Sequence, residues 1–262
     1  MSQSTTHDPT GQLSMDSLPD PDRVHAPAVL ARFKRALNLS MAAVIALALV
    51  FFLGGEAPAA LTVQPQKLAG LVGIATAPLL HGSVEHLAAN ALSVLILGTL
   101  AGTVFPRATL RALPLIWFGA GFGTWLIGTG GYHLGASGVT HGLGYLVFTL
   151  AVLRRDRASI AAALIAFFFF GGMLLSVLPM EMGISWESHL SGAIAGVLSG
   201  LLWRRADPLP PRRRYSWEVE PEPAEADVLE PARPDEVPVI WRRAPSDEAV
   251  ILRFRPRPPP EQ

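Results

Sequence analysis

The stretch Gly135-Ala136-Ser137-Gly138 begins an apolar run that ends at Leu153. It contains the main candidate for a functional residue of the chain, Ser137. Small residues on both sides of the serine leave space for a substrate backbone to approach its hydroxyl. If a helix begins here, its first N–H groups lack helical partners and favour a developing negative charge. An acyl-transfer nucleophile needs this arrangement, although small residues at a helix start also serve as packing contacts.

The composition indicates a membrane protein. Half of the 262 residues are hydrophobic, and the formal net charge is zero. Charged side chains are sparse between Ala36 and Trp203, so this stretch cannot present a solvated globular surface. The absence of cysteine excludes thiol catalysis, disulfides and cysteine metal ligands, and the balanced charge gives no reason to expect a nucleic-acid partner. The charged residues of the stretch are Glu56, Lys67, Glu85, Arg107, Arg111, Arg154, Arg155, Asp156, Arg157, Glu181 and Glu187.

The predicted fold class is an all-α membrane protein, with a six-helix transmembrane bundle in residues 36–203. Each apolar segment is about the length that crosses ~30 Å of hydrocarbon. Residues 1–35 and the Pro-, Arg- and Glu-rich residues 204–262 are expected to be disordered cytoplasmic tails. Residues 54–80 form a long connection, of the kind that is usually functional or partly inserted. The predicted helices are Leu37–Leu53, Val84–Val104, Ala112–Ile127, Ala136–Leu153, Ala158–Leu178 and Glu187–Trp203.

Lysine and arginine placement predicts the orientation. Nearly all of these residues in and beside the bundle fall at the helix ends that share the side of the termini, and Lys67 alone falls on the opposite side. Both termini are therefore predicted to be cytoplasmic, in a multi-pass protein of the cell membrane. The Ala-, Arg- and Pro-rich composition is typical of bacteria with GC-rich genomes, which favours a bacterial plasma membrane.

Polar residues are expensive inside apolar helices and therefore call for a reason. Those of this chain gather in the first turns of the second, fourth and sixth predicted helices, which all run inward from the outer face. The residues concerned are His86 with Asn90, Ser137 with His141, and His189. They are expected to lie at one depth, just below the outer surface.

His86 and Asn90 are four residues apart and share a helix face, from which both can donate hydrogen bonds. Beside Ser137, with its own backbone N–H, they would form an oxyanion hole. The alternative is a hydrogen-bonded pair that holds two helices together.

His189 begins a stripe of small residues, Gly192, Gly196 and Gly200. Such a stripe lets a neighbouring helix approach closely, here the helix that carries Gly138 and Gly142. Close approach is what a direct hydrogen bond from Ser137 to His189 requires, and the histidine would then act as general base. The alternative is a glycine packing contact whose histidine faces the aqueous rim.

No carboxylate is placed as a third triad member. Glu187 points away from His189 on its helix, and Glu85 lies on a different face from His86, so the residues favour a serine–histidine dyad. A zinc site is the competing use of clustered histidines, but no His-Glu-x-x-His appears, and the only carboxylates near the outer ends are Glu56, Glu85, Glu181 and Glu187. No metal and no cofactor are therefore expected.

Three motifs in this order resemble the rhomboid intramembrane serine proteases: His81-Gly-Ser-Val-Glu-His86-Leu-Ala-Ala-Asn90, Gly135-Ala-Ser137-Gly138, and His189-x-x-Gly192-x-x-x-Gly196. The resemblance covers residues 36–203. It implies a six-helix fold that cleaves transmembrane substrates near their outer ends, with Ser137 as nucleophile and His189 as general base and acid. It also implies oxyanion donors from His86, Asn90 and the Ser137 N–H, and a His81 that braces the first external loop.

The chain departs from the family pattern at two points. The Trp-Arg pair usual in the first external loop is absent from residues 54–80. The position four after the serine, commonly Tyr or Phe, is His141, which is expected to stack on His189, with a role as a competing base as the alternative. His133, before the serine, is interpreted as a rim residue.

Two other classes of protein compete with a protease. A catalytically inactive member of the same fold would bind transmembrane segments without cutting them, but such a binder needs neither Ser137 nor His189. A transporter would need a polar route to the inner face, and the predicted helices are almost wholly apolar below Asn90, His141 and Gly196. The expected partners are transmembrane protein substrates and the lipid bilayer.

Overall fold

The computed structural model describes residues 21–179 and 185–209. The predictions for residues 1–20 and 210–262, the greater part of both tails, lie outside the described residues. The described helices are α1 (Pro21–Gly54), α2 (Gly73–Thr76), α3 (Val84–Val104), α4 (Pro106–Ile127), α5 (Ser137–Arg154), α6 (Arg157–Phe170) and α7 (Trp186–Leu202). Short 3₁₀ turns lie at Ala59–Leu61 (η2), Leu68–Leu71 (η3), Ala77–Leu79 (η4) and Gly171–Leu174 (η5).

The all-helical class is confirmed, but the predicted count of six transmembrane helices is not. Of the described helices, three are long and apolar enough to cross a membrane by length and composition: Pro27–Gly54 within α1, then α3 and α4. Among the remaining described helices, α5 carries His141 and several glycines of the site, and α7 is only 17 residues long. Helix α6 is shorter than predicted, because the pair Gly171-Gly172 follows Phe170 and glycine disfavours continued helix.

The first helix also differs from its prediction. It begins at Pro21 and not at Leu37, so the expected disordered tail 1–35 is helical from Pro21 onward. Proline is favoured at the first helical position because it has no N–H to leave unpaired. The residues that follow include a run rich in alanine, arginine and leucine, which are good helix formers.

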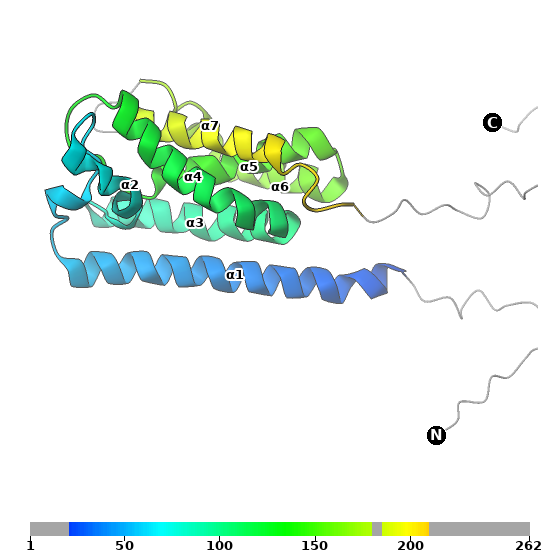
Figure 1. The fold of residues 1–262 in the computed structure, drawn as a ribbon. Helices are drawn as coiled ribbons and strands as arrows, with labels where there is room; N and C mark the ends of the chain where they lie inside the picture. The colour runs from blue at the N-terminus through cyan, green and yellow to red at the C-terminus, as the bar shows by residue number, and fades with distance from the viewer. Residues whose placement is uncertain (1–20, 180–184, 210–262) are drawn as a thin grey trace, which may run out of the picture. The chain divides into compact units, whose positions relative to one another are not determined.

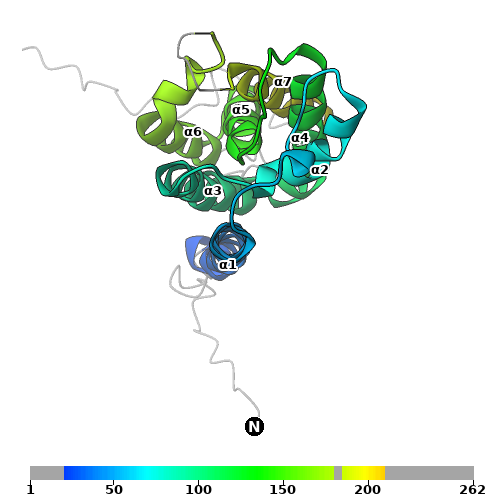
Figure 2. The same cartoon turned by 90° about the vertical axis from the view of Figure 1, so that its left-hand side faces the viewer.

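Helix α5 lies in the middle of the bundle, with α3, α4, α6 and α7 around it (Figure 2). Helix α1 lies outside this group and packs along α3 (Figure 1). Small residues make that contact close: a Cβ on Gly98 would lie 2.5 Å from Ser40 Oγ, and one on Gly102 would lie 2.9 Å from Ala36 Cβ. Because α3, α4, α6 and α7 pack around α5, the helix that begins at Ser137 is surrounded by other helices of the bundle.

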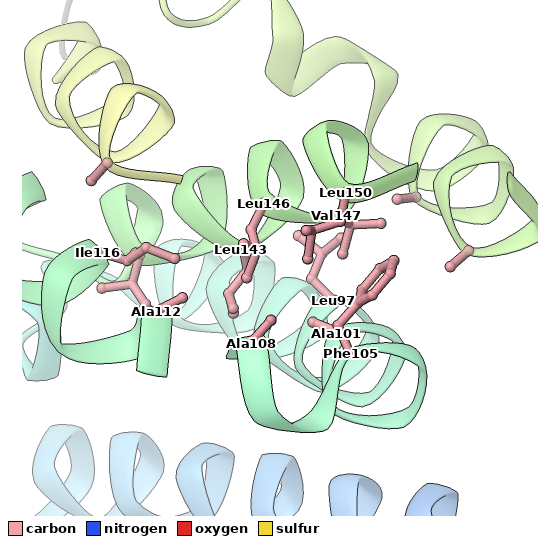
Figure 3. Close-up of a cluster of buried hydrophobic side chains, with 14 residues drawn as sticks. Leu97, Ala101, Phe105, Ala108, Ala112, Ile116, Leu143, Leu146, Val147 and Leu150 are labelled. Atoms are coloured by element: carbon pink, nitrogen blue, oxygen red, sulfur yellow. The ribbon is translucent and has the colours of Figure 1, made fainter. Parts of the chain in front are cut away.

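The main apolar core occupies the half of the bundle away from the N-terminus of α5. Figure 3 shows the labelled side chains of α3, α4 and α5 meeting in one cluster. Threonine hydroxyls at this level of α3 and α5 donate to carbonyls of their own helices, as Thr99 does to Leu95 and Thr149 to Tyr145, so they are satisfied within these helices. The largest fully buried side chains of the cluster are Leu97, Phe105, Ile116, Leu146, Val147 and Leu150.

The long connection between α1 and α3 is docked on α4. The indole of Trp117 donates to the carbonyl of Ala75 at 3.0 Å, and that of Trp125 donates to the carbonyl of Lys67 at 2.9 Å. Val63 and His133 form an isolated antiparallel bridge with N···O distances of 2.9 and 3.0 Å. These contacts hold the connection to the loop before α5.

The end of α7 is fastened to the start of α4. Both carboxylate oxygens of Asp207 accept hydrogen bonds, one from the N–H of Arg107 at 3.0 Å and the other from the N–H of Ala108 at 2.8 Å. Asp207 thus satisfies N–H groups that a helix start leaves unpaired. The contact fixes the end of α7 that is distant from His189.

Candidate active site

A cavity of about 970 Å³ lies at the N-terminal ends of α3, α5 and α7. Its lining comes from these three helices, from the loop before α5 and from the segment after α6. All five polar residues that the sequence places at one depth line it: His86, Asn90, Ser137, His141 and His189. The structure thus brings these candidate residues together around one space.

Ser137 is the first residue of α5 and is half-buried. At this position its backbone N–H has no acceptor within its own helix. Gly138 leaves room for α7 and α4, because a Cβ there would lie 2.5 Å from Ser188 Oγ and 3.0 Å from Ala120 Cβ. The nucleophile candidate therefore sits where a helix start, a cavity and a close helix contact meet.

Helices α5 and α7 approach each other as closely as the glycine stripe predicts. A Cβ on Gly192 would overlap the carbonyl oxygen of Gly138, and a Cβ on Gly196 would overlap that of Gly142. No residue larger than glycine fits at either position without moving a helix backbone. This contact sets the separation of the helix that carries Ser137 from the helix that carries His189.

His189 is buried and held on two sides. Its Nδ1 lies 3.1 Å from the backbone oxygen of Ser176, and its ring stacks on that of His141 with a centroid distance of 3.8 Å. Within the described residues no hydrogen bond joins the Ser137 hydroxyl to the His189 ring. Catalytic hydrogen bonds are often long without substrate and tighten when it binds.

His141 is buried and engaged at both ring nitrogens. Its Nδ1 lies 2.7 Å from the carbonyl oxygen of Ser137, and its Nε2 lies 2.9 Å from Ser176 Oγ. The ring is therefore held beside His189 by its own helix and by the segment after α6. A base must offer a free lone pair, so this geometry favours the stacking interpretation of His141.

Gly135 brings the loop before α5 against the α3 donors. Its φ of +114° is one that residues with a side chain rarely adopt. A Cβ there would lie 2.5 Å from His86 Nε2 and 3.5 Å from Asn90 Nδ2. Asn90 Nδ2 is buried without a hydrogen-bond partner among the described residues. It can therefore donate a hydrogen bond to a substrate group beside the loop that leads to Ser137.

His81 lies before α3, buried against His86 in an edge-to-face contact with a centroid distance of 5.0 Å. Burial and the neighbouring His86 lower the pKa of His81 to about 4, so its ring is neutral near pH 7. A neutral ring packed on His86 fits a brace for the first external loop and for the His86 ring.

The loop before α5 is tied to the start of α7. Glu187 is buried and accepts hydrogen bonds from the N–H of Thr129 at 3.0 Å and from its hydroxyl at 2.7 Å. His133 Nε2 donates to the carbonyl of Gly130 at 2.9 Å, and Nδ1 then accepts from the Ser185 hydroxyl at 2.6 Å. Glu187 thus braces this loop, and His133 is part of the same brace.

Several of these residues were not predicted from the sequence. Ser176 falls inside the predicted fifth helix but lies in the turn after η5, and no motif marks it. Other residues act through hydrogen bonds between segments that are distant in the sequence: Thr129, Ser185, Trp117 and Trp125. Only the pattern of a polar residue in an apolar stretch could have drawn attention to Ser176. Among residues 21–179 and 185–209, no group of three or more potential metal ligands is found.

Comparison with known proteins decides the family. The model of the Rhomboid domain matches residues 68–206, more than half of the chain. The chain belongs to the rhomboid family. Together with the apolar helices of the structure, this makes it a multi-pass membrane protein. The rhomboid match begins after α1 and includes every candidate site residue.

The curated relatives are mycobacterial and uncharacterized. The chain is 38% identical over 149 residues to an uncharacterized protein of Mycobacterium tuberculosis (strain ATCC 25618 / H37Rv), which is 53% of this chain and 62% of the relative. It is 36% identical over 142 residues to an uncharacterized protein of Mycobacterium leprae (strain TN), covering 50% of this chain and 56% of the relative. The rhomboid chain thus spans less than two thirds of these relatives. No solved structure matches it.

Proposed function

We propose that the protein is an intramembrane serine endopeptidase with a Ser137–His189 dyad. The observation that carries the proposal is the single cavity that both residues line, together with His86 and Asn90. The glycine contact between α5 and α7 supports it, because a direct transfer of a proton between the two side chains requires that closeness.

The reaction would follow serine acyl transfer. Ser137 Oγ attacks the carbonyl carbon of the scissile bond while His189 Nε2 takes the hydroxyl proton. The tetrahedral intermediate collapses, its C–N bond breaks, and His189 gives the proton to the leaving amine. Water then attacks the acyl-enzyme, with His189 again removing a proton, and the carboxylic acid departs as Ser137 Oγ recovers its hydrogen.

The negative charge on the intermediate's oxygen would be held by three groups: the Ser137 N–H, His86 and Asn90. The close contact at Gly135 supports this, because it brings the loop that leads to Ser137 against His86 Nε2 and Asn90 Nδ2. Donors already in place in a site partly shielded from water stabilise such an oxyanion without reorganisation. No cofactor enters this scheme.

The substrates would be transmembrane proteins, cut near their extracytoplasmic ends. This follows from the proposed orientation, with both termini in the cytoplasm of a cell whose plasma membrane holds the protein. Helices α3, α5 and α7 then present their N-terminal ends to the outer face. A fluorescent protein fused to the C-terminus should fluoresce in the cytoplasm, whereas alkaline phosphatase at the same position should be inactive.

A mechanism-based fluorophosphonate probe tests the nucleophile in the solubilised full-length protein. Wild type should be labelled and the Ser137→Ala variant should not, although both retain the same thermal unfolding. The competing function, an inactive rhomboid protein that binds transmembrane segments, predicts no labelling of folded wild type. Labelling that persists in Ser137→Ala would place the nucleophile elsewhere.

A further inference from the structure

Ser176 contacts both histidines of the site, although it belongs to none of the sequence motifs. It lies in the turn that follows η5, and it lines the same cavity as Ser137. Its Oγ lies 2.9 Å from His141 Nε2, and its backbone oxygen lies 3.1 Å from His189 Nδ1. One residue of the segment after α6 thus contacts both rings of the stacked pair.

The hydrogen-bond partners of His141 and His189 determine which nitrogen of each ring carries the proton. A backbone carbonyl can only accept, so the hydrogen bond to Ser176 O requires a proton on His189 Nδ1. The bond between His141 Nδ1 and the Ser137 carbonyl, at 2.7 Å, requires one on His141 Nδ1 in the same way. The remaining nitrogen of neutral His141, Nε2, then accepts from the Ser176 hydroxyl.

This assignment leaves His189 Nε2 without a proton, which is the state a general base needs. In a triad a carboxylate fixes the histidine tautomer, and here the nearby Glu187 is bonded to Thr129 instead. The carbonyl of Ser176 would do the orienting that the missing carboxylate does elsewhere.

We propose that Ser176 is a positioning residue for the catalytic base. Its carbonyl holds His189 in the Nδ1–H tautomer, and its hydroxyl holds the His141 ring against which His189 stacks. The catalytic role of Ser176 rests on the proposed function. The hydrogen bonds that Ser176 makes to the two histidines do not depend on it. The chain of contacts runs from the Ser137 carbonyl through His141 and Ser176 to His189, so the turn after α6 controls the geometry of the base.

The tautomers can be measured without any activity. Full-length protein with ¹⁵N-labelled histidine, in detergent micelles at neutral pH, gives long-range ¹H–¹⁵N spectra that separate Nδ1–H from Nε2–H rings. Single substitutions His141→Phe and His189→Gln assign the signals. The Nδ1–H form is expected at both rings, and an Nε2–H form at His189 would overturn the proposal.

The hydroxyl is tested by the rate of labelling with the fluorophosphonate probe. Ser176→Ala should lower the maximal labelling rate about 2- to 10-fold, because one neutral hydrogen bond is lost. The probe concentration that gives half of the maximal rate should stay within about twofold of the wild-type value. Ser176→Thr keeps a hydroxyl and should recover most of the rate. Ser199→Ala is the matched control, because it removes a buried hydroxyl that has no partner among the described residues, and it should leave the rate unchanged.

A double variant isolates the route through His141. In the His141→Phe background no ring nitrogen remains for the hydroxyl to reach, so Ser176→Ala should cause no further loss. An equal loss in both backgrounds, or no loss in the wild-type background, would overturn the proposal. If folded wild type is not labelled at all, the proposed function fails, and the tautomer measurement still decides the arrangement around Ser176.

Discussion

The rings of His141 and His189 stack, with centroids 3.8 Å apart and planes inclined by 12°. One ring comes from the helix that begins at the nucleophile candidate, and the other is the candidate base. Two stacked imidazoles are favourable only while they do not both carry charge, so the contact disfavours protonation of both rings at once.

Replacing His141 by phenylalanine should preserve this contact. His141→Phe keeps an aromatic surface but loses two hydrogen bonds, so we expect labelling and cleavage to fall by about tenfold or less. His141→Ala should lose more, because His189 would also lose its packing. A normally folded His141→Phe protein with under about a hundredth of wild-type turnover, a loss of ~2.7 kcal/mol, would show that His141 takes part in the chemistry.

The dyad predicts a non-additive pair of substitutions. Ser137→Ala and His189→Ala should each abolish cleavage and leave thermal unfolding close to that of wild type. The double variant should be little worse than either single one, since members of one catalytic unit act together. Full activity in either single variant would exclude the mechanism.

Removal of an oxyanion donor should slow the reaction without stopping it. Asn90→Ala deletes one donor of several, so a rate loss of roughly 10- to 1000-fold is expected, and His86→Ala should be at least as harmful. A purely structural role predicts lower thermal stability with unchanged turnover per folded molecule. Turnover and unfolding temperature measured on the same samples separate these roles.

The contact between α5 and α7 should not tolerate a methyl group. A Cβ on Gly192 would overlap the Gly138 carbonyl, so Gly192→Ala should destabilise the protein by about 1–3 kcal/mol and reduce labelling by moving His189 away from Ser137. Gly54→Ala is the matched control, because nothing lies within 4 Å of a Cβ there. Equal stability and labelling in both variants would contradict a close helix contact.

His81 should make stability depend on pH. Its pKa in the folded protein is lowered from 6.5 to about 4 by burial and by His86, so between these values the unfolded chain binds a proton that the folded one does not. The free energy of unfolding should therefore fall as the pH is lowered from about 6.5 to 4. In His81→Phe, which keeps the edge-to-face contact, the loss of unfolding temperature between pH 7.5 and 5 should be smaller; an equal loss would show that another group is responsible.

Helix α3 could be predicted from the sequence at both ends. Its predicted and observed bounds are both Val84–Val104. Local chemistry explains this: the Ser83 hydroxyl accepts from the His86 N–H at 3.2 Å at the start, and Pro106 begins the next helix just beyond the end. The glycine contact of α5 with α7 was predictable for a similar reason, because a stripe of small residues has few uses other than close packing.

Other features depend on contacts that sequence periodicity does not contain. The docking of residues 55–83 on α4 depends on two indole hydrogen bonds to carbonyls far away in the chain. The place of Ser176 beside both histidines arises because α6 ends at Phe170, whereas a smooth apolar run suggested helix to Leu178. That the polar residues would gather around one space was predictable, but the partners of each ring nitrogen were not.

If the protein is the proposed peptidase, the apolar half of the bundle determines from which side of the membrane the reaction receives water and protons. Hydrolysis consumes a water molecule, and protons must exchange with a bulk phase after each turnover. Because buried apolar side chains such as Leu97, Phe105, Ile116 and Leu146 fill the interior beyond the cavity, we expect both exchanges to occur through the end that holds Ser137. In a sealed vesicle with the protein in one orientation, turnover would follow the buffer on that face and ignore acidification of the opposite compartment.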